Sequence, residues 1–196
     1  EIQESLKVFQ GNPKEKMPEL AEMARKIIGP HIKPMLVYAA DMMFHSPLQF
    51  YYNDKLMNRG YPEIAIVGDT RTGKTDVATF LGNHYGVGSY TDLKYASAAG
   101  LVGGASQLPN GGYKVTWGTI VMNHRGMVIL DEFSGVSTEV MSKLTSVRSS
   151  QRARVEKIAK GEAPAYTRLF WISNPRTQRD GSSWALKRYT SGIQVM

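Results

Sequence analysis

The sequence predicts an α/β fold built around a parallel β-sheet with helices on both faces. Short apolar segments at residues 63–68, 127–130 and 167–174 have the length and composition of buried strands. Segments with helical periodicity separate these strands, and strands that alternate with helices favour a parallel sheet. A glycine-framed lysine follows the first strand directly and opens the next predicted helix, as a strand–loop–helix unit requires.

Residues 1–60 are predicted to be helical. Within 14–28, apolar residues recur at the spacing of one helix face: Met17, Leu20, Met23, Ala24, Ile27 and Ile28. Gly29–Pro30 ends this helix, and a second helix is predicted over 32–45. We therefore divide the chain into an N-terminal helical segment, 1–60, and the α/β unit that follows, 61–196.

Local patterns predict the remaining elements of the α/β unit. They are a helix from Lys74, a short strand near 87–91, strand-like alternation over 113–122 and a helix over 137–149. The last helix begins at a Ser/Thr cap. A glycine-rich stretch at 100–112 interrupts the alternation.

The loop after the first strand reads Gly-Asp-Thr-Arg-Thr-Gly-Lys-Thr and fits the pattern G-x-x-x-x-G-K-[ST] throughout. Its glycines let the backbone turn N–H groups around a phosphate, and the helix that follows adds its N-terminal dipole. Lys74 would reach the terminal phosphates, and the Thr75 hydroxyl can ligate Mg²⁺. The predicted ATP-binding residues are therefore Gly68, Asp69, Thr70, Arg71, Thr72, Gly73, Lys74 and Thr75.

Two further strands end in polar residues suited to the same chemistry. Asp131 and Glu132 follow the apolar strand 127–130, and Asn174 ends the strand 167–174. Carboxyl ends of parallel strands meet at one edge of a sheet and bind ligands there. Asp131 would join Thr75 in the Mg²⁺ shell, while Glu132 would orient and deprotonate the attacking water. Asn174 would hold that water or the γ-phosphate, so these residues and Lys74 predict an ATP hydrolase.

Composition excludes several classes of protein and points to one class of partner. The 196 residues include no cysteine, which excludes a disulfide framework and a thiolate metal site. No apolar stretch approaches the ~18–20 residues of a membrane span, and we expect an intracellular protein, cytoplasmic or nucleoid-associated. The net charge is +7, and residues 143–188 hold eleven basic residues against three acidic ones. A polyanionic partner explains this concentration, and so does a solvated helix face.

Three runs of the sequence resemble a known family. YTDLKYASAAGL, LPNGGYKVTWGTIVMNHRGMVILDEF and KIAKGEAPAYTRLFWISNP, in this order, resemble the AAA+ core of the minichromosome maintenance (MCM) replicative helicases. The resemblance spans about residues 20–176. Its specific parts are SAAGL, GTIVMNHRGMVILDEF and IAKG, because many P-loop enzymes share the phosphate loop and the DEF sequence.

The resemblance implies a three-layer P-loop sandwich that works as a hexameric, ATP-driven DNA helicase or translocase in DNA replication. Segment 101–117 would be the helix-2-type insert, with its tip near 109–112. Segment 152–168 would be the hairpin before the sensor strand, with Lys160 at its tip facing single- or double-stranded DNA in the channel. Lys157 and Arg154 would be further DNA contacts in this basic hairpin, and Asn174 would be the sensor.

The phosphate loop departs from the family pattern, which has proline, alanine and serine where this chain has Thr70, Gly73 and Thr75. The family's trans-acting arginine and helical lid are expected beyond Met196.

Two alternatives to a DNA helicase remain open. One is a protein-remodelling AAA+ ATPase whose turnover does not respond to DNA. The other is an ATP-binding recruitment module without turnover, against which the second carboxylate, Glu132, argues.

Overall fold

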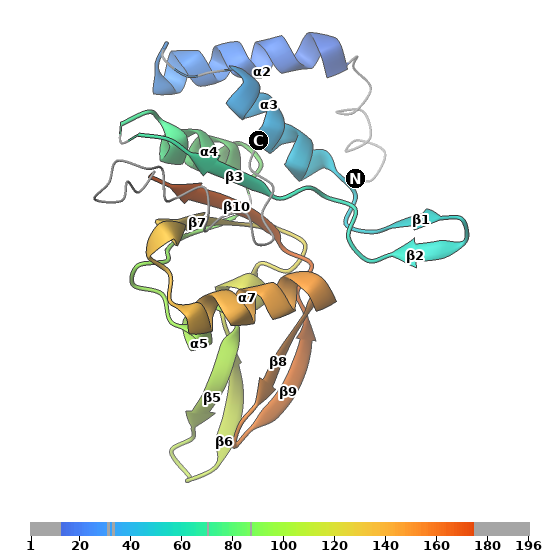
Figure 1. Cartoon of the computed structure of the whole chain (residues 1–196), viewed down its shortest axis with the longest axis vertical. Helices are drawn as coiled ribbons and strands as arrows, with labels where there is room; N and C mark the ends of the chain where they lie inside the picture. The colour runs from blue at the N-terminus through green and yellow to red at the C-terminus, as the bar shows by residue number, and fades with distance from the viewer. Residues whose placement is uncertain (1–12, 31, 33, 70, 87, 175–196) are drawn as a thin grey trace, which may run out of the picture.

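A four-stranded parallel sheet forms the centre of the molecule (Figure 1). The computed structural model describes residues 13–30, 32, 34–69, 71–86 and 88–174. In spatial order the strands are β3 (Ile64–Val67), β10 (Arg168–Ser173), β7 (Met127–Asp131) and β4 (Ser89–Asp92). All neighbours pair in parallel, which confirms the predicted α/β fold.

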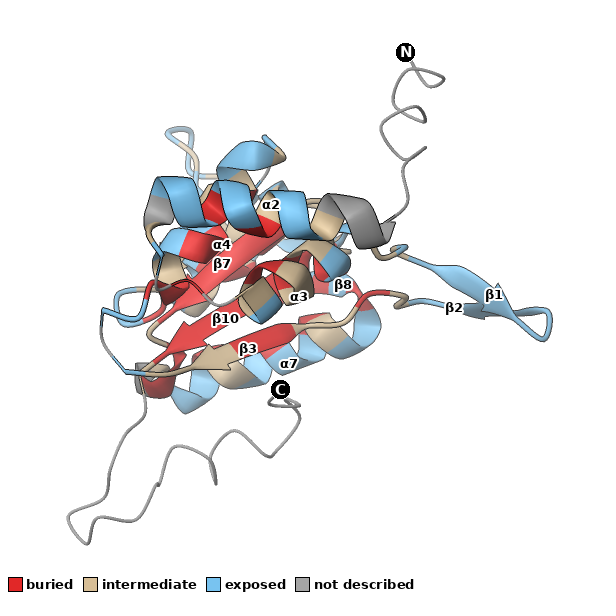
Figure 2. Ribbon diagram, turned by 90° about the horizontal axis from the view of Figure 1, so that it is seen from above, coloured by how far each residue is buried: buried red, intermediate tan, exposed pale blue. Residues whose placement is uncertain are grey.

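Helices cover both faces of the sheet (Figure 1). One face packs against α3 (Pro34–His45) and α4 (Lys74–His84), and α2 (Pro13–Ile28) packs on these two helices. The other packs against α5 (Ala98–Leu101), α6 (Thr119–Met122) and α7 (Thr138–Ser150). Successive side chains of a strand point to opposite faces, so Phe170 and Trp171 enter different core clusters and both are fully buried. The two central strands, β7 and β10, are buried along their whole length (Figure 2), whereas β3 is buried in part and the edge strand β4 is partly exposed.

The helices predicted over 14–28, 32–45 and 137–149 are confirmed, but the prediction that residues 1–60 are helical is wrong for residues 50–57. This segment forms an antiparallel hairpin of β1 (Phe50–Tyr52) and β2 (Lys55–Met57). The two residues between the strands, Asn53 and Asp54, have φ of 47° and 58°. Positive φ at both central residues is typical of the tightest hairpin turns, which asparagine and aspartate tolerate. Every residue of both strands is exposed, and the hairpin stands away from the core (Figure 2).

The strand-like alternation predicted over 113–122 ends at Trp117. β6 (Tyr113–Trp117) pairs with β5 (Gly103–Gln107), a strand that forms within the glycine-rich stretch 100–112. At Gly118 the chain passes close to the end of α5, and the Gly118 amide donates to Val102 O at 3.1 Å. A Cβ at this position would lie 2.6 Å from Gly100 O, so only glycine allows the approach, after which the chain enters α6.

A third hairpin lies beside the second (Figure 1). It joins β8 (Arg152–Glu156) to β9 (Lys160–Pro164) in antiparallel register. A Cβ added at Gly161 would lie 3.1 Å from Val115 Cγ2 and 3.4 Å from Trp117 Cζ2. The missing side chain of Gly161 therefore lets the indole of β6 pack closely against β9, and the two hairpins form one projecting unit.

A nearly buried ion network joins β3, α7 and β10. The Glu63 side chain, 6% exposed, accepts hydrogen bonds from Arg148 Nε at 2.9 and 2.7 Å, and Arg59 Nη2 lies 3.0 Å away. Trp171 Nε1 also donates to this carboxylate at 3.3 Å. Arg148 belongs to the basic segment noted in the sequence, but its charge is matched inside the protein.

Arg168 is a second basic residue of this segment whose side chain is used inside the fold. It is 7% exposed and donates to the carbonyl oxygens of Met43, Arg125 and Ser46 at 3.0, 3.1 and 2.6 Å. The bonds to Met43 and Ser46 satisfy carbonyl groups at the end of α3, as a basic residue near a helix C-terminus commonly does. Burial lowers the pKa of the Arg168 guanidinium.

In the described part of the chain, no helix combines the length and the apolar character needed to cross a membrane.

Candidate nucleotide-binding site

A polar cavity opens at the carboxyl edge of the sheet. It has a volume of about 270 Å³ and lies between the loop after β3, the start of α4 and the ends of β7 and β10. Eight of its lining residues were predicted for the site: Arg71, Thr72, Gly73, Lys74, Thr75, Asp131, Glu132 and Asn174. Asp76 and Ile172 complete the lining. The fold therefore brings together residues from three separate parts of the sequence.

Lys74 is the first residue of α4, and its side chain reaches back into the loop. Its ammonium group donates to Gly68 O at 2.8 Å, to Asp69 O, and to Thr72 Oγ1 at 3.2 Å, and the residue is 8% exposed. Burial is the main cause of a lowered pKa for Lys74, and the charge of Asp131 opposes it. A cation held among loop carbonyls can exchange these weak acceptors for the oxygens of a phosphate.

The two motif glycines differ in their backbone conformation. Gly73, the residue before α4, has φ of 74°, a conformation that side chains disfavour. Gly68 needs no such freedom, because an added Cβ would make only ordinary contacts at 3.6 Å. Its amide does not turn into the loop but donates to Ser173 O at 3.2 Å, extending the pairing of β3 with β10. Thr70, also predicted to bind nucleotide, lies outside the described residues.

Asp131 is held by three hydrogen bonds. Its Oδ2 accepts from Thr75 Oγ1 at 2.9 Å and from Tyr90 Oη at 2.9 Å, and its Oδ1 accepts from the Glu132 amide at 2.7 Å. The carboxylate is 8% exposed. A hydroxyl and a carboxylate side by side are the hard oxygen donors that Mg²⁺ prefers, so the residues present fit the ion that accompanies a nucleotide.

Tyr90 was absent from the residues predicted for the site. It lies on β4, is 51% exposed, and reaches Asp131 with its phenol. Burial and the hydrogen bond to Asp131 raise the pKa of Tyr90, so the phenol keeps its proton and acts as the donor.

Glu132 and Asn174 lie together at the ends of neighbouring strands. Asn174 Nδ2 donates to Glu132 Oε1 at 2.9 Å. Glu132 has φ of 54°, which ends β7 and starts the short 3₁₀ turn η1 (Phe133–Gly135). Left-handed backbone at a residue other than glycine is uncommon and concentrates at functional sites. Sequence reasoning paired these two residues by chemistry, and the structure brings their side chains into contact.

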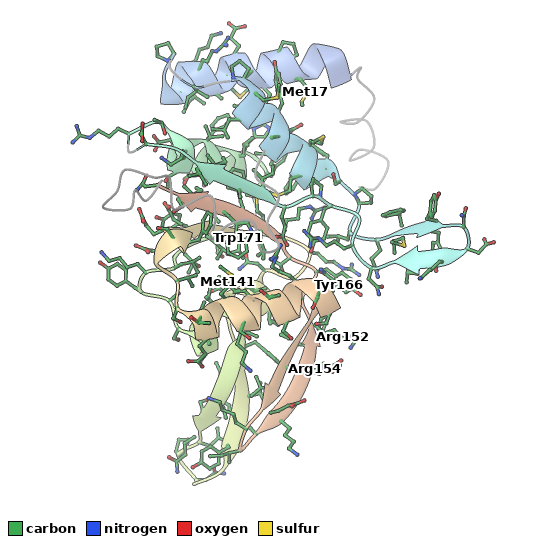
Figure 3. All side chains as sticks on the ribbon, viewed as in Figure 1. Met17, Met141, Arg152, Arg154, Tyr166 and Trp171 are labelled. Atoms are coloured by element: carbon green, nitrogen blue, oxygen red, sulfur yellow. The ribbon has the colours of Figure 1, made fainter. Side chains whose placement is uncertain are left out.

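The β8–β9 hairpin carries the predicted nucleic-acid contacts, but their charges differ in availability. Arg154 Nε donates to Glu162 Oε2 at 2.7 Å and Arg152 Nη1 to Glu162 Oε1 at 2.5 Å. Both arginines lie along β8 (Figure 3). Their hydrogen bonds lower the pKa of Glu162. Among the described residues, no acidic side chain pairs with Lys157 or Lys160, which are exposed.

Lys160 is not at the tip itself. The loop of the hairpin comprises residues 157–159, and Lys160 is the first residue of β9, in register with Glu156. The exposed Ile158, 72% accessible, lies in the loop between the two lysines. Four other basic residues of the segment lie outside the described part of the chain: Arg176, Arg179, Lys187 and Arg188.

Comparison with known proteins identifies the family. A model of the MCM P-loop domain matches residues 10–181. DNA replication licensing factor MCM4 of Arabidopsis thaliana is 29% identical over 123 residues, and MCM4 of Oryza sativa subsp. japonica is 28% identical over 123 residues; each match covers 62% of this chain. DNA replication licensing factor mcm5 of Dictyostelium discoideum is 28% identical over 105 residues, or 53% of the chain. Each match covers 14% of the relative's own length. Because the domain model matches most of the chain and the site has the strand ends that its motif requires, the chain belongs to the MCM P-loop domain family.

Proposed function

We propose that the protein is an ATP hydrolase of the MCM helicase type, in which ATP turnover drives movement along DNA. The observation that carries the proposal is the convergence of two polar pairs beside Lys74. The Thr75 hydroxyl contacts Asp131, and the Asn174 amide contacts Glu132, both at 2.9 Å. A P-loop lysine, a metal-binding pair and a carboxylate next to a polar sensor are the parts that phosphoryl transfer to water requires.

The loop residues Gly68, Asp69, Thr70, Arg71, Thr72 and Gly73 would surround the phosphates, and Lys74 would bind the terminal ones. Thr75 and Asp131 would hold Mg²⁺, which neutralises phosphate charge when it is bound. Glu132 would accept the proton of the attacking water. Asn174, through its hydrogen bond to Glu132, would keep that carboxylate directed at the water and contact the γ-phosphate.

Within this proposal the chain is an AAA+ core, residues 61–196, preceded by an N-terminal segment, residues 1–60, that contains α2, α3 and the β1–β2 hairpin. The β5–β6 hairpin corresponds to the helix-2-type insert and the β8–β9 hairpin to the one that precedes the sensor strand. The contact between Gly161 and Trp117 supports their action as one unit. α2 and α3 share a core cluster with α4, so the helical segment would move with the core.

The proposed partner is DNA, contacted in the channel of a hexameric ring of identical subunits. Lys157 and Lys160 are the strongest candidates for phosphate contacts, since each is exposed next to the hairpin loop. Arg154 contributes less, because its guanidinium already pairs with the Glu162 carboxylate, which it shares with Arg152. The process would be DNA replication, which the names of the relatives specify for those proteins, at an intracellular location.

The Lys74→Ala variant tests the nucleotide site. Loss of a charged donor to phosphate costs about 1.5–3 kcal/mol, so the Kd for a fluorescent ATP analogue should rise by about 10- to 100-fold. Titration of the analogue with wild-type and variant protein, in Mg²⁺ buffer, measures this directly. Lys143→Ala is the matched control, because Lys143 is an exposed lysine on α7. Wild-type affinity in Lys74→Ala would refute the site.

The Lys157→Ala and Lys160→Ala variants test the DNA partner. Each should weaken binding of single-stranded DNA irrespective of its base sequence and reduce the slope of log Kd against log salt by about 1. Fluorescence anisotropy at several salt concentrations measures both quantities. Lys26→Ala on α2, whose lysine pairs with Glu22 at 3.0 Å, serves as the control. ATP turnover that does not respond to DNA would instead favour a protein-remodelling ATPase, and tight ATP binding without turnover a recruitment module.

A further inference from the structure

The carboxylate of Asp131 is fixed from two sides by different elements. Thr75 at the start of α4 and Tyr90 on β4 both donate to Oδ2 at 2.9 Å, while the Glu132 amide donates to Oδ1 at 2.7 Å. The Thr75 and Glu132 contacts come from the motif residues themselves. The Tyr90 contact comes from the strand at the edge of the sheet, which contributes no other predicted site residue.

The register of the sheet explains why a tyrosine is needed there. β4 pairs with β7 so that Asp92 lies opposite Asp131 and Tyr90 opposite Ile129. Tyr90 therefore starts two residues, about 7 Å, behind Asp131 along the strand direction and one strand, about 4.8 Å, to the side. A tyrosine side chain can span this offset and donate at its end. Serine or threonine is too short, and phenylalanine has no donor.

We propose that Tyr90 is a positioning residue for the nucleotide-bound Mg²⁺, acting through Asp131. This inference rests on the proposed ATP-binding function and adds a residue to its metal site. A carboxylate free to rotate must lose that freedom when it joins a metal shell, whereas one already held by hydrogen bonds has lost it on folding. Residues that hydrogen-bond a metal ligand typically change metal affinity by 10- to 100-fold when they are replaced.

A purely structural role for Tyr90 makes a different prediction. Its ring is half exposed at the sheet edge, and a tyrosine that only covers the edge is replaced by phenylalanine without effect. Tyr90→Phe keeps the ring and removes only the donor to Asp131. The variant therefore separates the phenol from the packing.

The test is a MgCl₂ titration of ATP-analogue binding by the full chain. In Tyr90→Phe, the Mg²⁺ concentration that gives half-maximal strengthening of binding should rise about tenfold. The affinity in EDTA and the thermal unfolding midpoint should match the wild type. Tyr113→Phe is the matched control, because Tyr113 is a strand tyrosine of similar exposure, 45%, on β6.

The outcomes separate this inference from the function on which it rests. A wild-type protein whose ATP affinity ignores Mg²⁺ refutes the proposed metal site and the role of Tyr90 together. Normal Mg²⁺ dependence in both wild type and Tyr90→Phe refutes only the role of Tyr90. An equal loss of affinity with and without Mg²⁺ also overturns it, since Tyr90 would then act on the nucleotide and not through Asp131.

Discussion

Replacing Glu132 with glutamine is expected to lower ATP turnover by about 100-fold or more while leaving ATP binding close to that of the wild type. A positioned general base contributes about 10²–10⁴ to a hydrolytic rate. Glutamine has the shape of glutamate and can still accept the hydrogen bond that Asn174 Nδ2 makes to Oε1 at 2.9 Å. The substitution thus removes the ability to take a proton and little else.

Steady-state phosphate release, with analogue affinity measured in parallel, checks this expectation. Glu139→Gln is the matched control, since Glu139 is an exposed glutamate in the first turn of α7. Turnover of Glu132→Gln near the wild-type rate would show that another group accepts the proton. Loss of binding together with turnover would show that Glu132 acts on the nucleotide itself.

Among the substitutions proposed here, Glu63→Gln is expected to lower the free energy of unfolding the most. The substitution removes the negative charge that contacts Arg148, whose side chain is 11% exposed, and the partly buried Arg59. Breaking a buried ion pair by removing one charge costs about 3–5 kcal/mol. Because glutamine can keep some of the hydrogen bonds, we expect about 3 kcal/mol. For a chain of this length that corresponds to a fall in Tm of about 6–12 °C.

Thermal unfolding followed by circular dichroism measures the change, with Glu22→Gln as control. Glu22 also pairs with a cation, Lys26 at 3.0 Å, but both side chains are well exposed, and exposed pairs contribute little. The control should therefore melt with the wild type. An unchanged Tm for Glu63→Gln would mean that the network at the start of β3 is not what joins α7 to the sheet.

The sheet and the core of the site could be predicted because their signals are local. Each buried strand is a continuous apolar run, so β3, β7 and β10 stand out from their surroundings without knowledge of their neighbours. The phosphate loop is a contiguous motif, and Asp131, Glu132 and Asn174 directly follow apolar strands. Since parallel strands end at the same edge, their proximity followed from the strand predictions alone.

Two errors of prediction have different causes, one local and one tertiary. The aromatic residues of 50–52 and the Asn53–Asp54 turn are local signals of the hairpin at 50–57. The helical prediction for the preceding residues was extended over this segment in spite of them. The change from β6 to α6 at Gly118 depends on a close approach to Gly100 O, which no pattern within 113–122 reveals.

The charge pattern shows what a sequence leaves undecided. In 143–188, Arg148, Arg152, Arg154 and Arg168 read alike, yet one completes a network with Glu63, two share Glu162, and one binds carbonyl oxygens. Only the positions of the partner groups in space distinguish these cases. Glu63, for example, is 85 residues from Arg148 along the chain. The concentration of basic residues was a weaker argument for a polyanionic partner than their number implied, and Lys157 and Lys160 now carry it.

For this protein, then, the sequence by itself determined the α/β class, the phosphate loop, the two carboxylates and the family, because periodicity and contiguous motifs are properties of neighbouring residues. The tertiary structure alone decided that Tyr90 reaches Asp131, that Trp117 packs on Gly161 to join two hairpins, and which basic side chains remain available to a partner. Those contacts join residues that are distant in the sequence, and their energies depend on register, burial and the distance between atoms, which only the packed chain defines.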